Sequence, residues 1–231
     1  MTTPITVARI MPRKGCVDVF NEFMLDGIEL AGYYKIPVIK PETKLPKRMV
    51  PFSEAVNGRA KPSPGTWIHF YEDDVKFECF WREPVKYVEK LRGFEGFVSP
   101  DYSLYADFTP AQQIWNTHRN YACGAWLQQS QGFHVLPNVR TDGWDSAPYS
   151  LAAAPRHSPI VVGSHGCLKN RGDRARFVRD LRMTVDVLDP SMILVYGTDS
   201  YGVFDYPKRL GIPVKVYPSE MQQRLGGYHE R

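Results

Sequence analysis

Six short apolar runs recur along the second part of this chain, and each is closed by glycine, proline or a polar residue. Runs without polar alternation are typical of strands buried on both faces. Several are joined by stretches with helical periodicity, and a helix between consecutive strands requires parallel pairing. The pattern therefore predicts an α/β protein with a mostly parallel sheet. The runs occupy residues 67–71, 96–98, 133–136, 160–163, 192–196 and 214–217.

An earlier run at residues 35–39 brings the predicted number of strands to about seven. Seven parallel strands with helices between them favour a complete or partial (β/α) barrel. A doubly wound open sheet is the alternative, because both architectures bury their strands on both faces and periodicity does not separate them. Helices are predicted at residues 77–91, 110–129, 171–187 and 206–210, the second with Thr109 as N-cap.

The N-terminal part has a different composition. Apolar spacing within residues 17–30 predicts a helix with one buried face. Residues 40–65 concentrate prolines and lysines, which predicts an irregular arm or cover. We expect residues 1–65, this helix and basic, proline-rich arm, to pack on the same domain as the β/α repeats of residues 66–231.

Ligands of α/β proteins gather at the carboxyl ends of parallel strands, and polar residues follow nearly every predicted strand. Asp73, Asp101 and Asp199 are candidate acid–base groups, although an Asp after a strand is also the ordinary N-cap of the next helix. His165 is a further catalytic candidate without an identifiable orienting partner. The catalytic residues therefore remain open. Candidate ligand-binding residues are Ser99, Asn138, Arg140, Ser164, Gly166 and Thr198.

Glycine-containing turns at residues 163–166 and 197–202 could present backbone N–H groups to a phosphate, or could contain glycine only because a tight turn requires it. Neither matches a P-loop or a dinucleotide-binding fingerprint. The sequence has no CxxC, HxH or HExxH spacing. We therefore predict no metal and no cofactor, although the carboxylates of Asp73, Asp101 and Asp199 would also suit magnesium or calcium.

The net charge of +4 is modest, and Lys and Arg are spread along the chain rather than gathered in one tract. Direct nucleic-acid binding is therefore expected to be weak or absent. No run approaches the ~18 apolar residues of a membrane span and no signal peptide is recognisable, so we predict a cytoplasmic protein. Its widely spaced cysteines are expected to be reduced thiols; they are Cys16, Cys79, Cys123 and Cys167.

Four motifs carry a family resemblance: SPDYSLY at residues 99–105, IWNTHRN at 114–120, VLPNV at 135–139 and GSHGCLKN at 163–170. With these motifs the chain resembles a family of bacteria and their phages known as a domain of unknown function. The resemblance covers roughly residues 67–217. It implies a shared fold but carries no activity.

The segments PRKGCVDVFNEF, KLPKRMVPFSEA and HFYEDDVKFE are similar to early proteins of actinobacterial phages. These include recombination directionality factors, which bind a serine integrase and redirect it from integration to excision. The resemblance implies a phage accessory protein in the cytoplasm of the host bacterium, acting by protein contact in DNA recombination or replication, with a serine integrase on DNA as partner.

An enzyme is the alternative: a hydrolase or transferase acting on a nucleotide-like or phosphorylated substrate at the strand ends. The polar residues there favour it. The absence of any complete catalytic motif opposes it.

Overall fold

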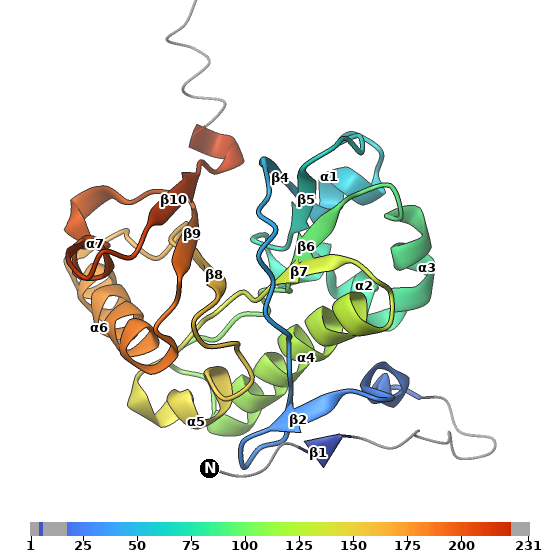
Figure 1. The fold of residues 1–231 in the computed structure, drawn as a ribbon, viewed down its shortest axis with the longest axis horizontal. Helices are drawn as coiled ribbons and strands as arrows, with labels where there is room; N and C mark the ends of the chain where they lie inside the picture. The colour runs from blue at the N-terminus through green and yellow to red at the C-terminus, as the bar shows by residue number, and fades with distance from the viewer. Residues whose placement is uncertain (1–4, 7–17, 223–231) are drawn as a thin grey trace, which may run out of the picture.

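The computed structural model describes the backbone of residues 5–6 and all of residues 18–222. Seven parallel strands form two sheets, and the order of strands in each sheet follows the chain (Figure 1). The prediction of an α/β protein with parallel strands is confirmed. The first sheet contains β4 (Arg48–Pro51), β5 (Thr66–His69), β6 (Gly96–Val98) and β7 (His134–Leu136). The second contains β8 (Pro159–Gly163), β9 (Met192–Tyr196) and β10 (Val214–Tyr217).

The predicted seven-stranded barrel is wrong, because the strands divide into sheets of four and three. Pro137 ends β7 and has no N–H to donate to a ladder. A single parallel bridge, Asn138 to Val161, is all that links the backbones of β7 and β8. The alternative of a doubly wound sheet does not form either, since such a sheet reverses its strand order and neither sheet here does.

The two sheets nevertheless share a buried interior. Each of the seven parallel strands contributes one side chain to a separate hydrophobic cluster between them. On the opposite edge, β10 reaches β4 through side chains only: the Tyr217 hydroxyl donates to the carbonyl of Pro46 at 2.6 Å. The cluster consists of Met49, Trp67, Val98, Leu136, Val161, Leu194 and Tyr217.

Helices cover the outer faces of both sheets. The predicted helix at residues 77–91 is two helices, because Pro84 interrupts it and Glu83 leaves helical geometry. The helix predicted at 110–129 has those bounds and begins with a capping box between Thr109 and Gln112. In chain order the α-helices are α1 (Phe52–Val56), α2 (Glu78–Arg82), α3 (Pro84–Lys90), α4 (Pro110–Gln129), α5 (Ala147–Ser150), α6 (Arg171–Leu188) and α7 (Asp205–Arg209).

The N-terminal predictions need correction. Within the described residues, the expected helix at 17–30 contains only the 3-10 turn η1 (Glu22–Leu25), followed by β2 (Glu29–Ala31). Gly27 and Gly32 have positive φ angles of 74° and 68°, which a continuing helix does not allow. β2 pairs antiparallel with β1 (Ile5–Thr6) and β3 (Ile36–Pro37), so the run at 35–39 belongs to a separate small sheet below α4 (Figure 1).

The arm predicted at residues 40–65 is partly regular. It supplies β4, which pairs in register with β5, and α1, whose Phe52 is fully buried. The seventh parallel strand is therefore β4 and not the run at 35–39. The sequence conceals β4 because it has only four residues and ends in a proline.

Candidate functional site

The carboxyl ends of β5, β6 and β7 bring together a buried group of polar side chains. Asp101 follows β6, while Asn138 and Arg140 follow β7. The Asp101 carboxylate accepts a hydrogen bond from Asn138 Nδ2 at 2.8 Å and one from Arg140 Nη2 at 2.7 Å. We call Tyr71, Ser99, Asp101, Asn138 and Arg140 the strand-end cluster.

Asn138 is the centre of the strand-end cluster. Its side-chain oxygen accepts from the Tyr71 hydroxyl at 2.9 Å, and its backbone N–H donates to Ser99 Oγ at 2.8 Å. Its amide nitrogen also reaches the carbonyl of Pro100 at 3.2 Å. Every polar group of this side chain is thus occupied by other residues of the protein, as buried amides require.

Two amides of α4 hold the loop that carries Asp101. Asn120 accepts from the backbone N–H of Tyr102 at 2.8 Å, and Asn116 donates to the carbonyl of Ser103 at 2.7 Å. Both are buried, although the hydrophilic sequence around them is equally compatible with a solvated face. Because α4 holds the two residues that directly follow Asp101, the position of Asp101 depends on the helix as well as on β6.

The Asp101–Arg140 pair is asymmetric in its exposure. The Asp101 side chain is buried, whereas 26% of the Arg140 side chain remains accessible. Burial raises the pKa of Asp101 above its ordinary value, and Arg140 opposes this shift. Burial would lower the pKa of Arg140, but the carboxylate of Asp101 raises it and leaves it above the usual value. Arg140 therefore stays cationic and is the member of the strand-end cluster that an anion can reach.

Aromatic rings close the space between the two sheets at the same end. Tyr71 and Tyr196 stack with centroids 4.9 Å apart, and His69 lies 4.2 Å from Tyr196. His69 Nδ1 accepts from the backbone N–H of Tyr71, while its Nε2 has no hydrogen-bond partner among the described residues. Burial lowers the pKa of His69 to about 3, so the imidazole is neutral over the physiological range.

Ser164 and Thr198 lie together, but the hydrogen bonds between them involve the backbone of Thr198 and connect two loops. Ser164 Oγ donates to the Thr198 carbonyl at 2.7 Å and accepts from the Thr198 N–H at 2.8 Å. These bonds tie the loop after β8 to the loop after β9. Gly197, at a φ of 124°, permits this close approach, since a Cβ there would lie 2.5 Å from Ser164 Oγ.

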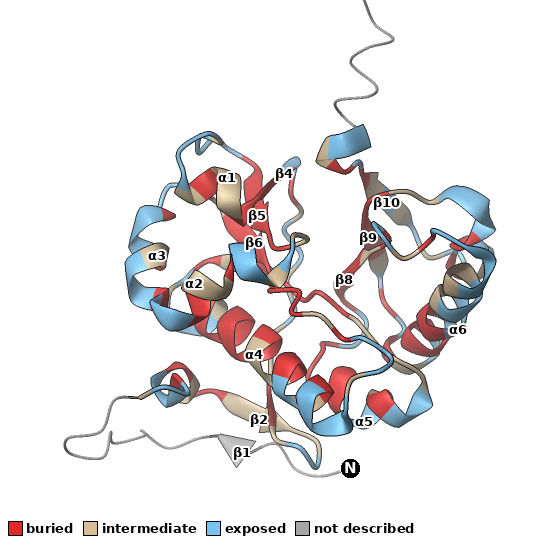
Figure 2. Cartoon of the chain, turned by 180° about the vertical axis from the view of Figure 1, so that it is seen from behind, coloured by how far each residue is buried: buried red, intermediate tan, exposed pale blue. Residues whose placement is uncertain are grey.

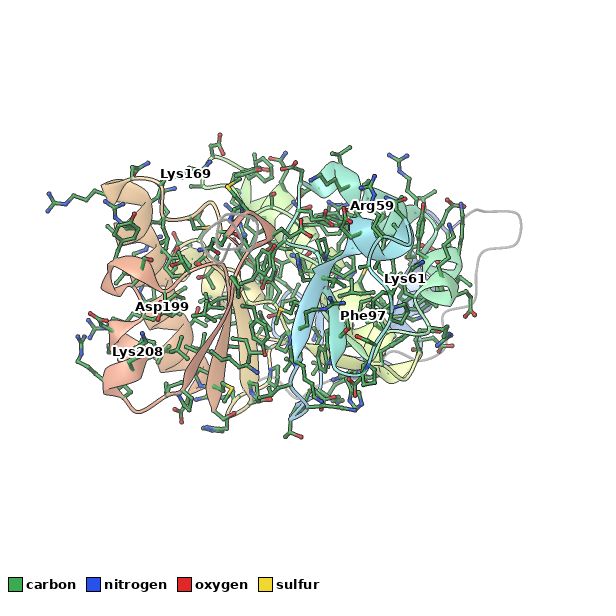
Figure 3. The ribbon with its side chains drawn as sticks, turned by 90° about the horizontal axis from the view of Figure 1, so that it is seen from above. Arg59, Lys61, Phe97, Lys169, Asp199 and Lys208 are labelled. Atoms are coloured by element: carbon green, nitrogen blue, oxygen red, sulfur yellow. The ribbon has the colours of Figure 1, made fainter. Side chains whose placement is uncertain are left out.

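The remaining candidates lie apart from the strand-end cluster. The side chain of Asp73 is 84% exposed, and its Oδ2 lies 3.9 Å from Lys76 Nζ. Asp199 forms an ion pair with Lys208 of α7 at 2.8 Å, on the outer side of the three-stranded half (Figure 3). His165 and Gly166 are exposed in the loop after β8. Ser99, Asp101, Asn138 and Arg140 are therefore brought together, and the other predicted residues do not join them.

The chemistry that this arrangement can perform is limited. Among residues 18–222 no group of three or more His, Cys, Asp or Glu side chains could hold a metal ion. Cys167 is near Arg140, but burial raises the pKa of its thiol, which disfavours a nucleophilic thiolate. What remains is one partly exposed guanidinium that could bind an anion.

Comparison with known proteins places the chain in a family. A family model described as a domain of unknown function (DUF4417) matches residues 28–209, which is more than half of the sequence. The chain belongs to this family. No solved structure matches it significantly.

Two relatives of this DUF4417 protein come from mycobacterial phages. The Gene 1 protein of Mycobacterium phage D29 is 28% identical over 213 residues, covering 92% of this chain and 76% of the relative. The Gene 1 protein of Mycobacterium phage L5 is 28% identical over 185 residues, covering 80% of each. The expected resemblance to a family with phage members is confirmed.

Sequence reasoning missed the contribution of the aromatic residues Tyr71 and Tyr196 and of His69. His69 is buried, yet only one of its ring nitrogens has a hydrogen-bond partner among the described residues. The available signal was the position of His69 and Tyr71 at the carboxyl end of a predicted strand. Separately, no helix in the described part of the chain is long and apolar enough to cross a membrane.

Proposed function

We propose that this DUF4417 protein is a phage accessory protein that acts by contact with another phage protein in DNA recombination or replication. The partner that the sequence resemblance favours is a serine integrase, bound as a recombination directionality factor binds it. The similarity to two mycobacteriophage proteins supports a phage role.

The observation that carries the proposal is a group of large hydrophobic side chains exposed on one side of the four-stranded half. Phe20 is 59% exposed, and Val75 is 83% exposed. The Phe20 ring meets Trp115 of α4 edge-on at 5.9 Å, and Trp115 in turn meets Trp81 of α2 at 5.6 Å. We call Val19, Phe20, Val75 and Trp115 the aromatic surface.

Charged residues connect the parts of the aromatic surface. Glu78 lies with Val75 along a shallow pocket and pairs with Arg119 at 3.0 Å, and the guanidinium of Arg119 lies 5.8 Å from the Trp115 ring. A rigid aromatic centre with a charged rim is the usual composition of a protein interface. Aromatic and Arg side chains also carry much of the binding energy at such interfaces.

The hydrogen bonding of the strand-end cluster favours a protein-binding function over catalysis. Asp101 and Asn138 use their hydrogen-bonding capacity on each other, on Arg140 and on the backbone. A general acid or base must instead reach a substrate proton. These residues therefore fit a role in holding the strand ends together.

The proposal is tested with a double variant, Phe20→Ala with Val75→Ala, whose two exposed side chains can be removed without opening the core. We expect binding to the cognate integrase to weaken at least tenfold, and integrase-dependent excision to fall with it. The matched control is Val85→Ala with Leu210→Ala, both 56% exposed and outside the aromatic surface. Unchanged integrase binding and excision in the first variant, with circular dichroism showing that both variants are folded, would refute the contact surface.

One observation favours the alternative enzyme. The accessible guanidinium of Arg140 lies at the strand ends, where a nucleotide-like or phosphorylated substrate would bind. At the same end, the buried Nε2 of His69 has no hydrogen-bond partner among the described residues. If this reading is right, thermal shift assays with a panel of nucleotides should find a ligand. Arg140→Gln should abolish that shift, whereas the Phe20→Ala, Val75→Ala variant should retain it.

A further inference from the structure

α6 and the residues just before it carry a local excess of positive charge. Between residues 169 and 182 there are six Lys and Arg residues and two Asp residues, an excess of four that equals the formal net charge of +4 for the whole chain. The formal charges of all remaining residues sum to zero. Lys169 lies just before α6, in the half that carries β8 to β10 (Figure 3).

Helix geometry arranges these cations on the outside of the protein. α6 buries Leu181, Val185 and Leu188 toward the three-stranded sheet and turns its other side to solvent (Figure 2). At 3.6 residues per turn, Arg171, Arg179 and Arg182 project within about 80° of one another around the helix axis. They extend over about 16 Å at 1.5 Å per residue. We call Arg171, Arg176, Arg179 and Arg182, all exposed, the arginine face.

Most of the arginine face has no carboxylate partner. Arg171, Arg176 and Arg182 form no ion pair among the described residues, whereas Arg179 pairs with Asp180 at 2.7 Å. The other acidic residue of the segment is Asp173. Its carboxylate accepts from Asn170 Nδ2 at 2.7 Å, and its backbone N–H donates to Asn170 Oδ1 at 2.9 Å. The three guanidiniums that form no ion pair among the described residues are spread over about 140° around the helix axis, because Arg176 lies about 60° beyond Arg179, and each can pair with an external anion.

Tyrosines flank the arginine face. The guanidinium of Arg182 lies 4.7 Å from the Tyr206 ring, and that of Arg174 lies 4.6 Å from the Tyr201 ring. A guanidinium stacked on a ring keeps its N–H groups in the plane directed outward, where they can donate to an oxygen ligand. The contacts therefore restrict the side chains at the edges of the face, and Arg174 also donates to the carbonyl of Leu168 at 3.2 Å.

We propose that the arginine face binds the phosphate backbone of duplex DNA without reading its sequence. Several arginines along one exposed helix can contact a row of phosphates, and such phosphate contacts position a protein on DNA. An acidic protein surface fits less well, because a protein interface has an apolar centre and the only large hydrophobic side chain exposed along α6 is Val178. This inference goes beyond the proposed function, because it requires neither the integrase nor the aromatic surface.

The test is fluorescence anisotropy of a labelled 20-base-pair duplex with the full-length protein alone, over a range of salt concentrations. The variant is Arg171→Gln, Arg176→Gln, Arg182→Gln. We expect the wild type to bind weakly, and the variant to bind at least tenfold more weakly at low salt. The salt slope should also become shallower, by up to about 2.7 for three lost phosphate contacts at about 0.9 each.

A control variant removes the same charge elsewhere: Arg48→Gln, Lys61→Gln, Lys90→Gln, exposed residues without an ion pair among the described residues. It should lose less than twofold in affinity. Equal losses in the two variants, or no duplex binding by the wild type at low salt, would overturn the inference. Tighter binding to single strands or to poly-glutamate than to the duplex would overturn it in favour of those ligands. Since no integrase is present, these results are independent of the test of the aromatic surface.

Discussion

The half built on β4 to β7 and the half built on β8 to β10 fill their interiors differently. In the first, fully buried phenylalanines pack ring against ring: Phe70 contacts Phe52 at 5.1 Å and Phe77 at 5.5 Å. In the second, branched aliphatic residues such as Ile160, Ile193 and Val195 face the helices. Outside, the first half exposes the aromatic surface and the second exposes the arginine face. The comparison shows that the two halves of one fold can expose surfaces of different chemistry, one apolar and one positively charged.

The largest expected effect concerns His69, where the two halves meet. Its pKa is about 3 in the folded protein and about 6.5 when unfolded, so the unfolded state takes up a proton first as the pH falls. Folding stability from this group is therefore complete above pH 6.5 and is lost toward pH 3. The loss is about 1.4 kcal/mol per pH unit and up to about 5 kcal/mol in total.

Urea unfolding at a series of pH values measures this loss. His69→Asn cannot be protonated, and its side-chain oxygen can still accept from the N–H of Tyr71. The difference in unfolding free energy between wild type and variant should thus depend on pH in this range. A difference that is constant from pH 7 to pH 4 would mean that the folded protein accommodates a charged His69 at the junction of the halves.

The second effect compares the two interiors directly. Phe70→Ala should cost about 4 kcal/mol, because it removes a ring that four other phenylalanines surround. Val195→Ala in the three-stranded half should cost about 2 kcal/mol, since it removes fewer buried atoms. Chemical denaturation of both variants measures the contrast. Equal losses of unfolding free energy would show that a buried phenylalanine in the first half stabilises the fold no more than a buried aliphatic residue in the second.

The third and smallest effect compares two aspartates, each of which follows a strand in a different half: Asp101 after β6 and Asp199 after β9. Asp101→Asn should cost about 2 kcal/mol, because it leaves the partly buried Arg140 without its counter-charge. Asp199→Asn should change stability by less than about 0.5 kcal/mol, since its pair with Lys208 is exposed. Thermal unfolding of the two variants side by side makes the comparison. A larger loss from Asp199→Asn would mean that the loop after β9 needs this charge.

Buried strands and well-capped helices were predictable from the sequence. The apolar runs at residues 96–98 and 192–196 gave β6 and β9 with their observed bounds, because a strand buried on both faces has little freedom in composition. The start of α4 was also predictable, because Thr109 is a favourable N-cap residue and Pro110 suits the first position of a helix. Strand pairing was not predictable, since it depends on where Pro137 breaks the ladder between β7 and β8.

The site was predictable only in part. Asp101, Asn138 and Arg140 were found because strand ends of parallel sheets converge, but their mutual pairing depends on loop geometry fixed by α4. Asp199 follows a strand equally well and yet turns outward to Lys208. The arginine face was missed because the charges were judged over the whole chain, whereas the helical period of α6 is what gathers them on one side.

The open seam between β4 and β10 has a consequence for behaviour at high concentration. Each of these edge strands has backbone groups without a neighbouring strand on one side, a template on which other chains can polymerise. Three residues at this seam oppose such pairing. Pro46 precedes β4 and Pro51 ends it. Lys215 lies exposed on β10, and its ammonium donates to the Pro46 carbonyl at 3.3 Å. The prolines and the lysine therefore disfavour pairing of this seam with the edge strands of other copies of the protein.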